Sequence, residues 1–442
     1  MAEGMDRRSF IKVTGSAAAV ASTGLAGILE SGRAPAYAQG TTLHIVRWND
    51  FIPEADVELK RQAPEASKAL GAEVRFEFIN GNDLQPRVTA AIQSGSGADI
   101  FMMLWNWPHL YANSLTDTSD VAEEVAKAQG GYYDVFRATA HVGGKWLAVP
   151  HGVVGNAVAY RRSRFEEIGV KEFPKTWEEY RQVGKKLKAK GHPIGQALGH
   201  SFGDPPTFSY PLMWDFGGAE TDKAGKQVVI NSKGTLDSVK FLQAFWKDAC
   251  DEGGLAWDDT NNNRAFHAGE LSASLNGASI YIVAKRQQDK IKDEKGQPLY
   301  LDIDHAGLLP GGPAGQFALY VPFQHAVMKY SKSQKLAKDF LRWLHTKANY
   351  EKWFVVNEGY NVGPTTAWED HPMWSKVDKP LQVFRRAVRQ ARMLGHAGPA
   401  TAHATEVYTK YIIVDMYAKA AGGTKAEDAV KWAESELKKI YA

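Results

Sequence analysis

The segment 42–104 constrains the fold of this chain most strongly, because strand-like and helix-like patterns alternate along it. Residues 42–46 and 73–79 alternate polar and apolar side chains, and 97–104 is an apolar run bounded by glycines before it and a proline after it. Residues 54–70 and 84–93 carry apolar side chains at helical spacing. Strands that are joined through helices pair in parallel, which predicts a βαβαβ unit of an α/β fold.

Polar and aromatic side chains follow each of these three predicted strands. They are Trp48 and Asn49 after the first strand, Asn80 and Asp83 after the second, and Trp105, Asn106 and Trp107 after the third. The carboxyl ends of parallel strands lie at one edge of a sheet, where α/β proteins bind ligands. This edge is therefore a candidate site. In the alternative interpretation the tryptophans close the core and the asparagines serve as caps and turns.

The amino-terminal residues have the features of an export signal. Arg7 and Arg8 form a twin-arginine pattern, residues 13–29 are small and apolar, and Ala36-Tyr37-Ala38 is an A-x-A cleavage site. We expect residues 1–38 to be a twin-arginine signal peptide and the mature protein to be periplasmic. No other apolar run reaches the roughly 20 residues that a membrane span needs.

Length and charge narrow the class of protein further. The expected mature chain of about 400 residues is longer than one hydrophobic core usually supports, which favours two domains. A formal net charge of +3 gives no basic footprint for nucleic acid, and we expect a monomer. Cys250 is the only cysteine, so no disulfide can form within the chain.

Two motifs raise other chemistries. Residues 199–203 match the G-x-S-x-G pattern of serine hydrolases, with Ser201 as the nucleophile, but Pro205 and Pro206 follow where the motif needs a helix. Asp259, Asn261, Asn263 and Glu270 have the spacing of a calcium loop, but Arg264 occupies the glycine position. The sequence shows neither a dinucleotide fingerprint nor a cysteine or histidine metal motif, so we expect no cofactor.

Further elements are predicted along the rest of the chain. Thr176 followed by Glu179 resembles a capping box that opens a helix reaching Lys190. Residues 231–246, 334–346 and 405–441 are predicted to be helical, and 153–160 and 323–328 to be strands. The segment 150–152 suits a crossing between domains, where His151 either contacts a ligand or supports the segment.

Several short motifs follow one another in a distinctive order. They are Gly97-Ala98-Asp99-Ile100, Tyr111-Ala112, Leu147-Ala148-Val149-Pro150 running into Ala159-Tyr160, the segment 173–179, the segment 206–212 with Gly217-Gly218, Phe266 with Gly269-Glu270, Asn276-Gly277, Leu309-Pro310-Gly311, and Ser331 with Ser333 before Ala337, Phe340, Trp343 and Leu344. In this order they resemble the extracellular solute-binding proteins of ABC importers, of the maltose-binding, sugar-uptake type. The resemblance covers essentially the whole expected mature chain.

The resemblance implies a two-lobed periplasmic binding protein of type II, with a mostly parallel sheet flanked by helices in each lobe. The N-lobe would comprise 39–149 and 322–365, and the C-lobe 150–321 and 366–442. Such a protein catalyses no reaction. It binds a ligand in a cleft at the crossovers, closes around it, and is recognised by the subunits of an ABC permease.

The resemblance also suggests which residues contact the ligand. Asn106 stands where the family often has a carboxylate that contacts sugar hydroxyls, and 206–208 stands at its aromatic platform. The chain departs there, because Thr207 replaces a ring and Ser279 stands where a tryptophan is common. The full expected set is Trp48, Asn49, Asn80, Asp83, Trp105, Asn106, Trp107, His151, Thr207, Phe208, Trp214, Asn276, Tyr281, Gln324 and Asn361.

These observations predict a binding protein for a neutral sugar, a small oligosaccharide or a polyol. Aromatic faces suit the C–H groups of sugars, and amide side chains suit their hydroxyls. One alternative is a binding protein for a polyamine or another small nutrient, which clustered acids in the cleft would indicate. The other is an exported hydrolase, which needs a histidine and an aspartate within reach of Ser201.

Overall fold

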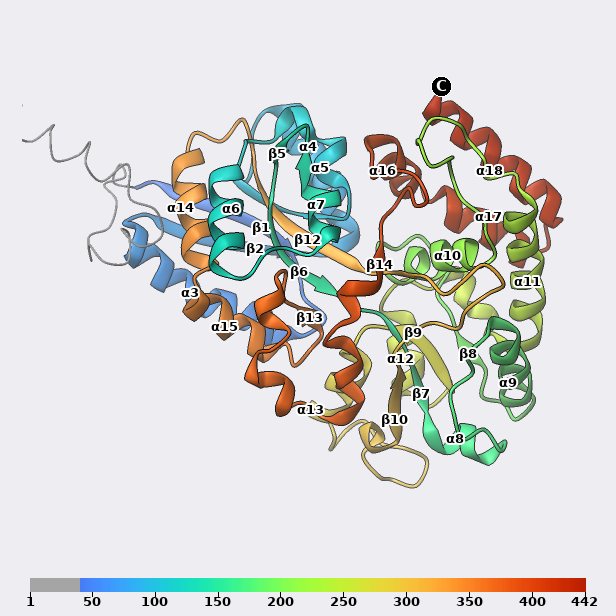
Figure 1. The fold of residues 1–442 in the computed structure, drawn as a ribbon. Helices are drawn as coiled ribbons and strands as arrows, with labels where there is room; N and C mark the ends of the chain where they lie inside the picture. Colours follow the sequence, from blue (N-terminus) through green and yellow to red (C-terminus); the bar gives the residue numbers. More distant parts are fainter. Residues whose placement is uncertain (1–39) are drawn as a thin grey trace, which may run out of the picture.

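The computed structural model describes residues 40–442, which form two α/β lobes side by side (Figure 1). The expected signal peptide, 1–38, lies outside the described residues. Each lobe is built on its own sheet: six strands in the order β13-β6-β12-β3-β1-β2 in the first, and four in the order β10-β7-β9-β8 in the second. The expectation of a two-lobed α/β fold is confirmed.

The predicted βαβαβ unit forms one half of the first sheet. β1 (Thr42–Trp48) pairs in parallel with β2 (Glu73–Ile79) and β3 (Ile100–Leu104), and α3 (Pro53–Leu70) and α4 (Gly81–Ser94) are the crossovers. The other half consists of β12 (Val321–Val327), β6 (Val149–Val154) and β13 (Asn361–Val362), which all pair antiparallel. The unbroken apolar run of β3 is explained by its position, because every residue of that strand is buried.

Helices surround the first sheet. α4 packs on β1 and β3, α3 on β2, α6 and α7 on β6, and α7 and α14 on β12. Besides α3 and α4, the helices of this part of the chain are α5 (Trp107–Leu110), α6 (Ser119–Ala128), α7 (Asp134–Ala140), α14 (Gln334–Leu344) and α15 (Lys347–Val356). A small hairpin of β4 (His141–Val142) and β5 (Lys145–Trp146) joins α7 to β6.

The second sheet is mainly antiparallel. β7 (Ala157–Arg161) pairs antiparallel with β10 (Ile303–Ala306) and β9 (Ala273–Asn276), and only β8 (Ile194–Gly195) pairs in parallel, with β9. The expectation of mostly parallel sheets is therefore wrong in this lobe and only half right in the first. The chain crosses from β6 directly into β7 and returns to the first lobe through β12, so these strands lack the helical crossover that parallel pairing needs.

The helices of the second lobe pack mainly on one another. α11 contacts α9, α10, α17 and α18, while α10 and α12 also reach β9. Their bounds are α8 (Arg162–Glu167), α9 (Trp177–Ala189), α10 (Asp204–Asp215), α11 (Lys233–Ala249), α12 (Asn261–His267), α13 (Ser279–Arg286), α16 (Ala402–Thr409), α17 (Ile412–Ala421) and α18 (Ala426–Tyr441). A two-stranded pair of β11 (Ala318–Leu319) and β14 (Ala391–Arg392) completes the fold.

The first turns of α9 and α10 show how nearby side chains determine where a helix begins. The predicted capping box is confirmed: Thr176 accepts the N–H of Glu179, and the Glu179 carboxylate accepts the N–H of Thr176. The expectation that Pro205 and Pro206 oppose a helix is wrong, because α10 begins at Asp204 and the prolines occupy its first turn. A proline is tolerated there, since the N–H groups of that turn have no partner within the helix.

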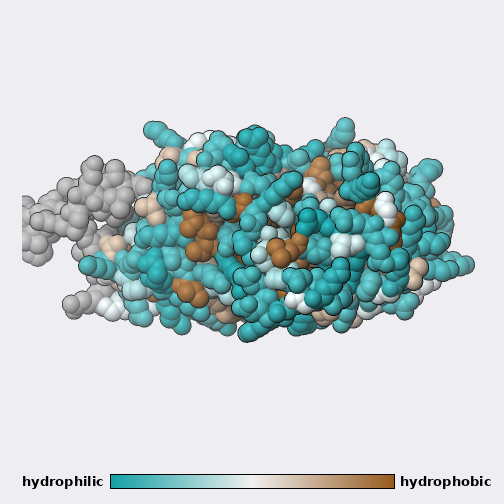
Figure 2. Space-filling view, turned by 90° about the horizontal axis from the view of Figure 1, so that it is seen from below, coloured by the Kyte–Doolittle hydropathy of each residue, from teal (hydrophilic) through white to brown (hydrophobic). Residues whose placement is uncertain are grey.

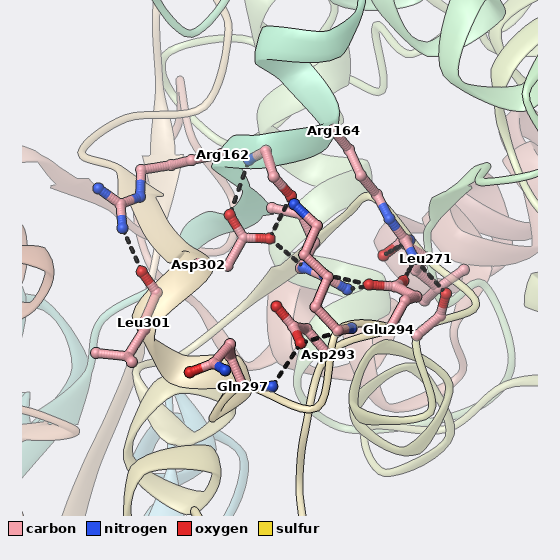
Figure 3. Close-up of polar contacts among 12 residues, drawn as sticks. Arg162, Arg164, Leu271, Asp293, Glu294, Gln297, Leu301 and Asp302 are labelled. Carbon is pink, nitrogen blue, oxygen red and sulfur yellow. Dashed lines mark hydrogen bonds and ion pairs between the residues drawn. The ribbon is translucent and has the colours of Figure 1, made fainter.

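A cluster of charges fastens a long loop of the second lobe (Figure 3). Arg161, at the end of β7, donates to Asp302 at 2.6 Å and to Glu294 at 2.8 Å. Arg164 donates to the carbonyl of Leu271 at 2.8 Å and also pairs with Glu294. Both guanidinium groups are almost fully buried, so these contacts hold the segment that follows α13 against β7 and α8.

The surface of the described residues carries few large apolar side chains. Figure 2 shows one face that is mostly hydrophilic, with small separate apolar patches. Val57 and Leu301 are the large hydrophobic side chains with high exposure, at 62% and 52%. Between residues 40 and 442, no helix has both the length and the apolar character to cross a bilayer.

Candidate functional site

Three neighbouring cavities lie between the lobes and share walls. Their volumes are about 20, 150 and 180 Å³. Phe202 lines all three, Phe51 and Asp259 line the first and second, and Gly81 and Asn82 line the second and third. Together they mark one cleft region, whose walls come from both lobes.

The wall of the first lobe comes from the carboxyl ends of its parallel strands. Trp48 ends β1, and Asn49 and Asp50 follow it, while Asn80 follows β2 and caps α4 by accepting the N–H of Asn82. The Trp48 ring lies 5.2 Å from that of Phe202, so the two lobes meet through aromatic rings.

The wall of the second lobe is organised around the start of α10. The Asp259 carboxylate accepts the N–H of Gly203 at 2.9 Å and of Asp204 at 2.7 Å. This places a carboxylate at the positive end of the helix. Asp204 in turn accepts the side-chain amides of Asn262 at 2.7 Å and Asn276 at 3.0 Å. The arrangement ties α10, α12 and β9 together directly behind the cleft.

Burial raises the pKa values of both of these carboxyl groups. Desolvation raises the pKa of Asp259 to about 6, and desolvation together with the charge of Asp259 raises the pKa of Asp204 well above its ordinary value. Asp50, on the opposite wall, has a pKa raised by burial although Ile52 and Asn361 donate to it. Acidic groups thus face the cleft from both lobes.

Direct contacts across the cleft hold the lobes together. Asn82 Oδ1, in the first turn of α4, accepts the backbone N–H of Phe202 at 3.1 Å and the hydroxyl of Ser201 at 3.4 Å. The Phe202 ring covers Gly81 so closely that a Cβ atom there would lie 2.1 Å from ring atom Cε1. Within the second lobe, Tyr408, on α16, donates its hydroxyl to the carbonyl of Phe202 at 2.9 Å and so supports this contact. The cleft is therefore narrow, with its lobes in contact.

Five of the residues expected from the sequence line the cleft. They are Trp48, Asn49, Asn80, Trp107 and Asn276. Asp83 lies close by in the first turn of α4, but its side chain is exposed and lines none of the three cavities. Thr207 and Asn361 stand one layer behind the walls, because Thr207 accepts the amide of Asn156 at 2.6 Å and Asn361 donates to Asp50 at 2.9 Å.

The structure places the other expected residues in the protein interior. Trp105 donates to the carbonyl of Tyr320 at 2.6 Å, and Gln324 donates to the carbonyl of Trp105 at 2.8 Å. Asn106 is fully buried and donates to the carbonyl of Leu394 at 3.0 Å, so its amide ties the first lobe to the segment before α16.

Four more expected residues also take part in interior packing. His151 lies in a bulge of β6, between the partners of Phe323 and Gln324, and its ring packs against His325 and His345. Phe208 packs on Trp177 and Phe245 in the second lobe. Trp214 contacts Tyr210 and His396, and Tyr281 donates to Asp378 at 2.9 Å. None of these four lines the three cavities.

Several residues of the cleft were not expected from the sequence. They are Asp50, Phe51, Asn82, Asn156, Phe202, Asp204, Asp258, Tyr360, Tyr408 and Tyr411. Asn82 and Phe202 lie beside turn-rich segments that the sequence does show, namely 80–83 and 199–203. Tyr360 gives no local signal, since it reaches the cleft only because β13 joins the first sheet.

The hydrolase and calcium motifs have structural roles here. The Ser201 hydroxyl donates to Asn82 and accepts the N–H of Asp259 at 3.2 Å, and within residues 40–442 no histidine is among its hydrogen-bond partners. The neighbouring His200 pairs instead with Asp415. In the same part of the chain, no group of three or more histidine, cysteine or acidic side chains is placed to hold a metal ion.

Comparison with known proteins gives one consistent result. A family model for bacterial extracellular solute-binding proteins matches residues 53–351. A probable ABC transporter-binding protein of Deinococcus radiodurans is 24% identical over 92% of this chain and 96% of its own length.

Solved structures share the fold. Maltose-bound MalE3 of T. maritima superposes with a TM-score of 0.75 at 20% identity, over 91% of this chain and 100% of its own. A solute-binding protein of Agrobacterium radiobacter K84 in complex with ribitol has a TM-score of 0.72 at 21% identity, over 91% and 99%. The family match covers most of the chain, and this protein belongs to the bacterial extracellular solute-binding proteins.

Proposed function

We propose that this protein captures a sugar, a small oligosaccharide or a polyol in the cleft between its lobes and delivers it to an ABC permease. The proposal rests chiefly on one observation: rings and hydrogen-bonding side chains from both lobes line the same cleft. Trp48 and Phe202 offer apolar faces to the C–H groups of a sugar, and Asn49, Asn80 and Asn276 offer amides to its hydroxyls. Relatives of the same fold bind maltose and ribitol, which supports this choice.

The mechanism is closure without a chemical step. A ligand that touches both walls binds the closed form more tightly than the open one, and therefore shifts the population toward the closed form. The contacts of Asn82 and Gly81 with Phe202 would form only on closure. The closed form is then the state that permease subunits recognise.

The proposal includes the cellular setting and the lobe boundaries. Export by the twin-arginine route to the periplasm rests on Arg7 and Arg8 with the apolar segment behind them. The N-lobe comprises 39–149 and 322–365, and the C-lobe 150–321 and 366–442, with 150–154 as the crossing segment that completes β6 of the first sheet. The protein acts as a monomer, without catalytic activity or nucleic-acid binding.

A polyamine or another small nutrient is the second candidate. The acidic side chains of the cleft favour it: the first two cavities are lined by Asp50, Asp204, Asp258 and Asp259. None of the described residues that line these two cavities is basic. A diamine would satisfy those carboxylates, whereas the aromatic and amide side chains of the same walls favour a carbohydrate.

A thermal-shift screen with sugars, polyols and putrescine tests the proposal. A ligand at about 100 times its Kd stabilises the folded state by about 2.7 kcal/mol, which is readily measured. We expect stabilisation by at least one sugar or polyol. Stabilisation by putrescine alone would transfer the assignment to polyamines.

A matched pair of variants locates the binding site. Asn49→Ala removes an exposed amide that lines the second cavity, and Asp83→Ala removes an exposed carboxylate that lines none of the three. We expect Asn49→Ala to raise the Kd for the sugar found in the screen, and Asp83→Ala to leave it unchanged. The reverse result would place the ligand elsewhere.

A further inference from the structure

The cleft combines four carboxyl groups with no basic side chain of its own. Asp50 approaches from the first lobe, and Asp204, Asp258 and Asp259 approach from the second. Among the described residues that line the first two cavities, none is lysine, arginine or histidine. These carboxyl groups therefore have no basic partner among the described side chains on the surface of these cavities.

The arginines that act electrostatically on Asp50 and Asp258 belong to other layers of the protein. Arg47 is fully buried behind Asp50, where it contacts His325 Nε2 at 2.6 Å and lies between the rings of Phe323 and Trp353. Arg264 influences Asp258 from α12 but lines none of the cavities. Neither arginine lines any of the three cavities.

At least one of these carboxyl groups remains ionised at neutral pH. Burial opposes ionisation of Asp258, but the hydroxyl and N–H of Thr260 and the N–H of Asn261 donate to its Oδ1 and lower its pKa. All three of these contacts use the same oxygen. Among residues 40–442 no hydrogen bond to its Oδ2 is present, so this oxygen is available to a ligand.

A second and independent feature lies among the same acids. Tyr360 is 4% exposed and lines the first cavity, but its hydroxyl has no hydrogen-bond partner in the described part of the chain. Its hydroxyl interacts electrostatically with Asp50, Asp204 and Asp259, which places it among these three carboxyl groups. The hydroxyl of a tyrosine that lines the cavity can donate a hydrogen bond to a ligand group there or accept one from it.

We infer that the ligand of this cleft carries a protonated amine beside its hydroxyl groups, as an amino sugar or an amino polyol does. The inference rests on the proposed function and narrows its ligand class, and it replaces the neutral sugar expected from the sequence with a charged one. An ammonium group has three donors and no acceptor, which matches a wall that offers carboxylate and hydroxyl oxygens. The rings of Trp48 and Phe202 would cover the carbon skeleton, and a nearby ring face also attracts a cation.

Isothermal titration of the purified protein with matched pairs of sugars tests this inference. Within each pair only C2 hydroxyl groups are replaced by amines: one in glucosamine and glucose, galactosamine and galactose, and mannosamine and mannose, and two in fully deacetylated chitobiose and cellobiose. The measurements are made at a pH at which the amines are protonated. We expect the amine of at least one pair to bind with a Kd at least about tenfold lower, because a charge-assisted hydrogen bond is roughly twice as strong as a neutral one.

Two variants identify the groups that recognise the amine. Asp258→Asn removes a charge while keeping an oxygen for the N–H groups of Thr260 and Asn261, and Tyr360→Phe removes only a hydroxyl. We expect both to raise the Kd of the amine by a larger factor than the Kd of its neutral partner. Asp251→Asn and Tyr320→Phe are the matched controls. Asp251 caps another turn, Tyr320 is a buried tyrosine whose hydroxyl also lacks a partner in residues 40–442, and neither lines the cleft.

Each outcome separates the inference from the proposed function. If the neutral member of every pair binds as tightly as its amine, the inference is overturned while the proposed function stands. If putrescine binds and no sugar or polyol does, both are overturned. A preference for the amine that Asp258→Asn and Tyr360→Phe leave intact would also overturn the inference, because the amine would then lie elsewhere.

Discussion

Gly81→Ala is expected to prevent the closed arrangement of the lobes without damaging either lobe. Gly81 is the first residue of α4 and lies against the ring of Phe202 from the other lobe. A Cβ at this position would lie 2.1, 2.6 and 2.8 Å from three atoms of that ring, which is far inside van der Waals contact. The ring is restrained, because its backbone N–H is bound to Asn82 and its face packs on Trp48.

The expected rise in the Kd of Gly81→Ala follows from the free-energy cost of overpacking. Inserting a methyl group into a well-packed contact costs about 1–3 kcal/mol, and here the cost applies only when the lobes meet. Since 1.4 kcal/mol is a factor of ten, the Kd for the ligand should rise by about five- to 150-fold. With the lobes apart the methyl group meets no ring, and alanine is the better helix former by up to about 1 kcal/mol.

The assay compares binding with stability. Titration calorimetry with the sugar found by the thermal-shift screen should show the higher Kd, while the melting temperature without ligand should be unchanged or higher. Small-angle scattering should show a smaller compaction on ligand addition than in the wild type. Gly307→Ala is the control, because its Cβ would meet Val383 at an ordinary 3.5 Å.

One result would refute this reasoning. If Gly81→Ala binds ligand with the wild-type Kd and compacts to the same extent, the contact between Gly81 and Phe202 plays no part in the closed state. A loss of binding together with a lower melting temperature would instead indicate damage to α4.

Three further predictions concern stability. Trp105→Ala should lower the free energy of unfolding by about 3–5 kcal/mol in urea titration, because the ring is fully buried and bonded to Tyr320; an unchanged midpoint would contradict its place in the core. Burial lowers the pKa of His345 to about 4, so its contribution to stability is fully present above the ordinary value of 6.5 and is lost as the pH falls toward 4. Between about pH 7 and about pH 5 the free energy of unfolding of His345→Gln should therefore fall by about 2 kcal/mol less than that of the wild type. Parallel profiles of unfolding free energy against pH for the two proteins would contradict this prediction. Burial raises the pKa of Glu220 to about 8, which has the opposite sign: the folded state holds a proton that the unfolded state releases, so stability falls as the pH rises from 4.5 to about 8. Relative to the wild type, the free energy of unfolding of Glu220→Gln should rise across that range, by about 3 kcal/mol at pH 7. A difference in unfolding free energy that does not change with pH would contradict this prediction.

The secondary structure was largely predictable because it depends on neighbours along the chain. The strict alternation at 73–79 gave the bounds of β2, and the capping box at Thr176 gave the start of α9. Both signals arise within one element, where side-chain periodicity and hydrogen bonds to the nearest turn decide the conformation. The start of α10 was mispredicted because the same prolines that break a helix interior are compatible with its first turn.

Strand direction was less predictable. The helical crossovers at 53–70 and 81–94 predict the parallel half of the first sheet correctly. β6 and β12 leave and re-enter that sheet through the other lobe, so no pattern within either strand reports its direction. Pairing there depends on where the second lobe returns the chain.

The sequence by itself determined the α/β pattern, the family and the edge of the first sheet on which Trp48, Asn49 and Asn80 lie. Only the tertiary structure decided that Trp105 and Asn106 are interior and that Phe202, Asp259 and Tyr360 form the opposing walls. The physical reason is that side-chain periodicity shows which face of a helix or strand is buried. It does not show whether that face packs in the core or lines the cleft between the lobes. The approach of two lobes, set by Gly81 beneath Phe202 and Asn82 beside it, decides that question.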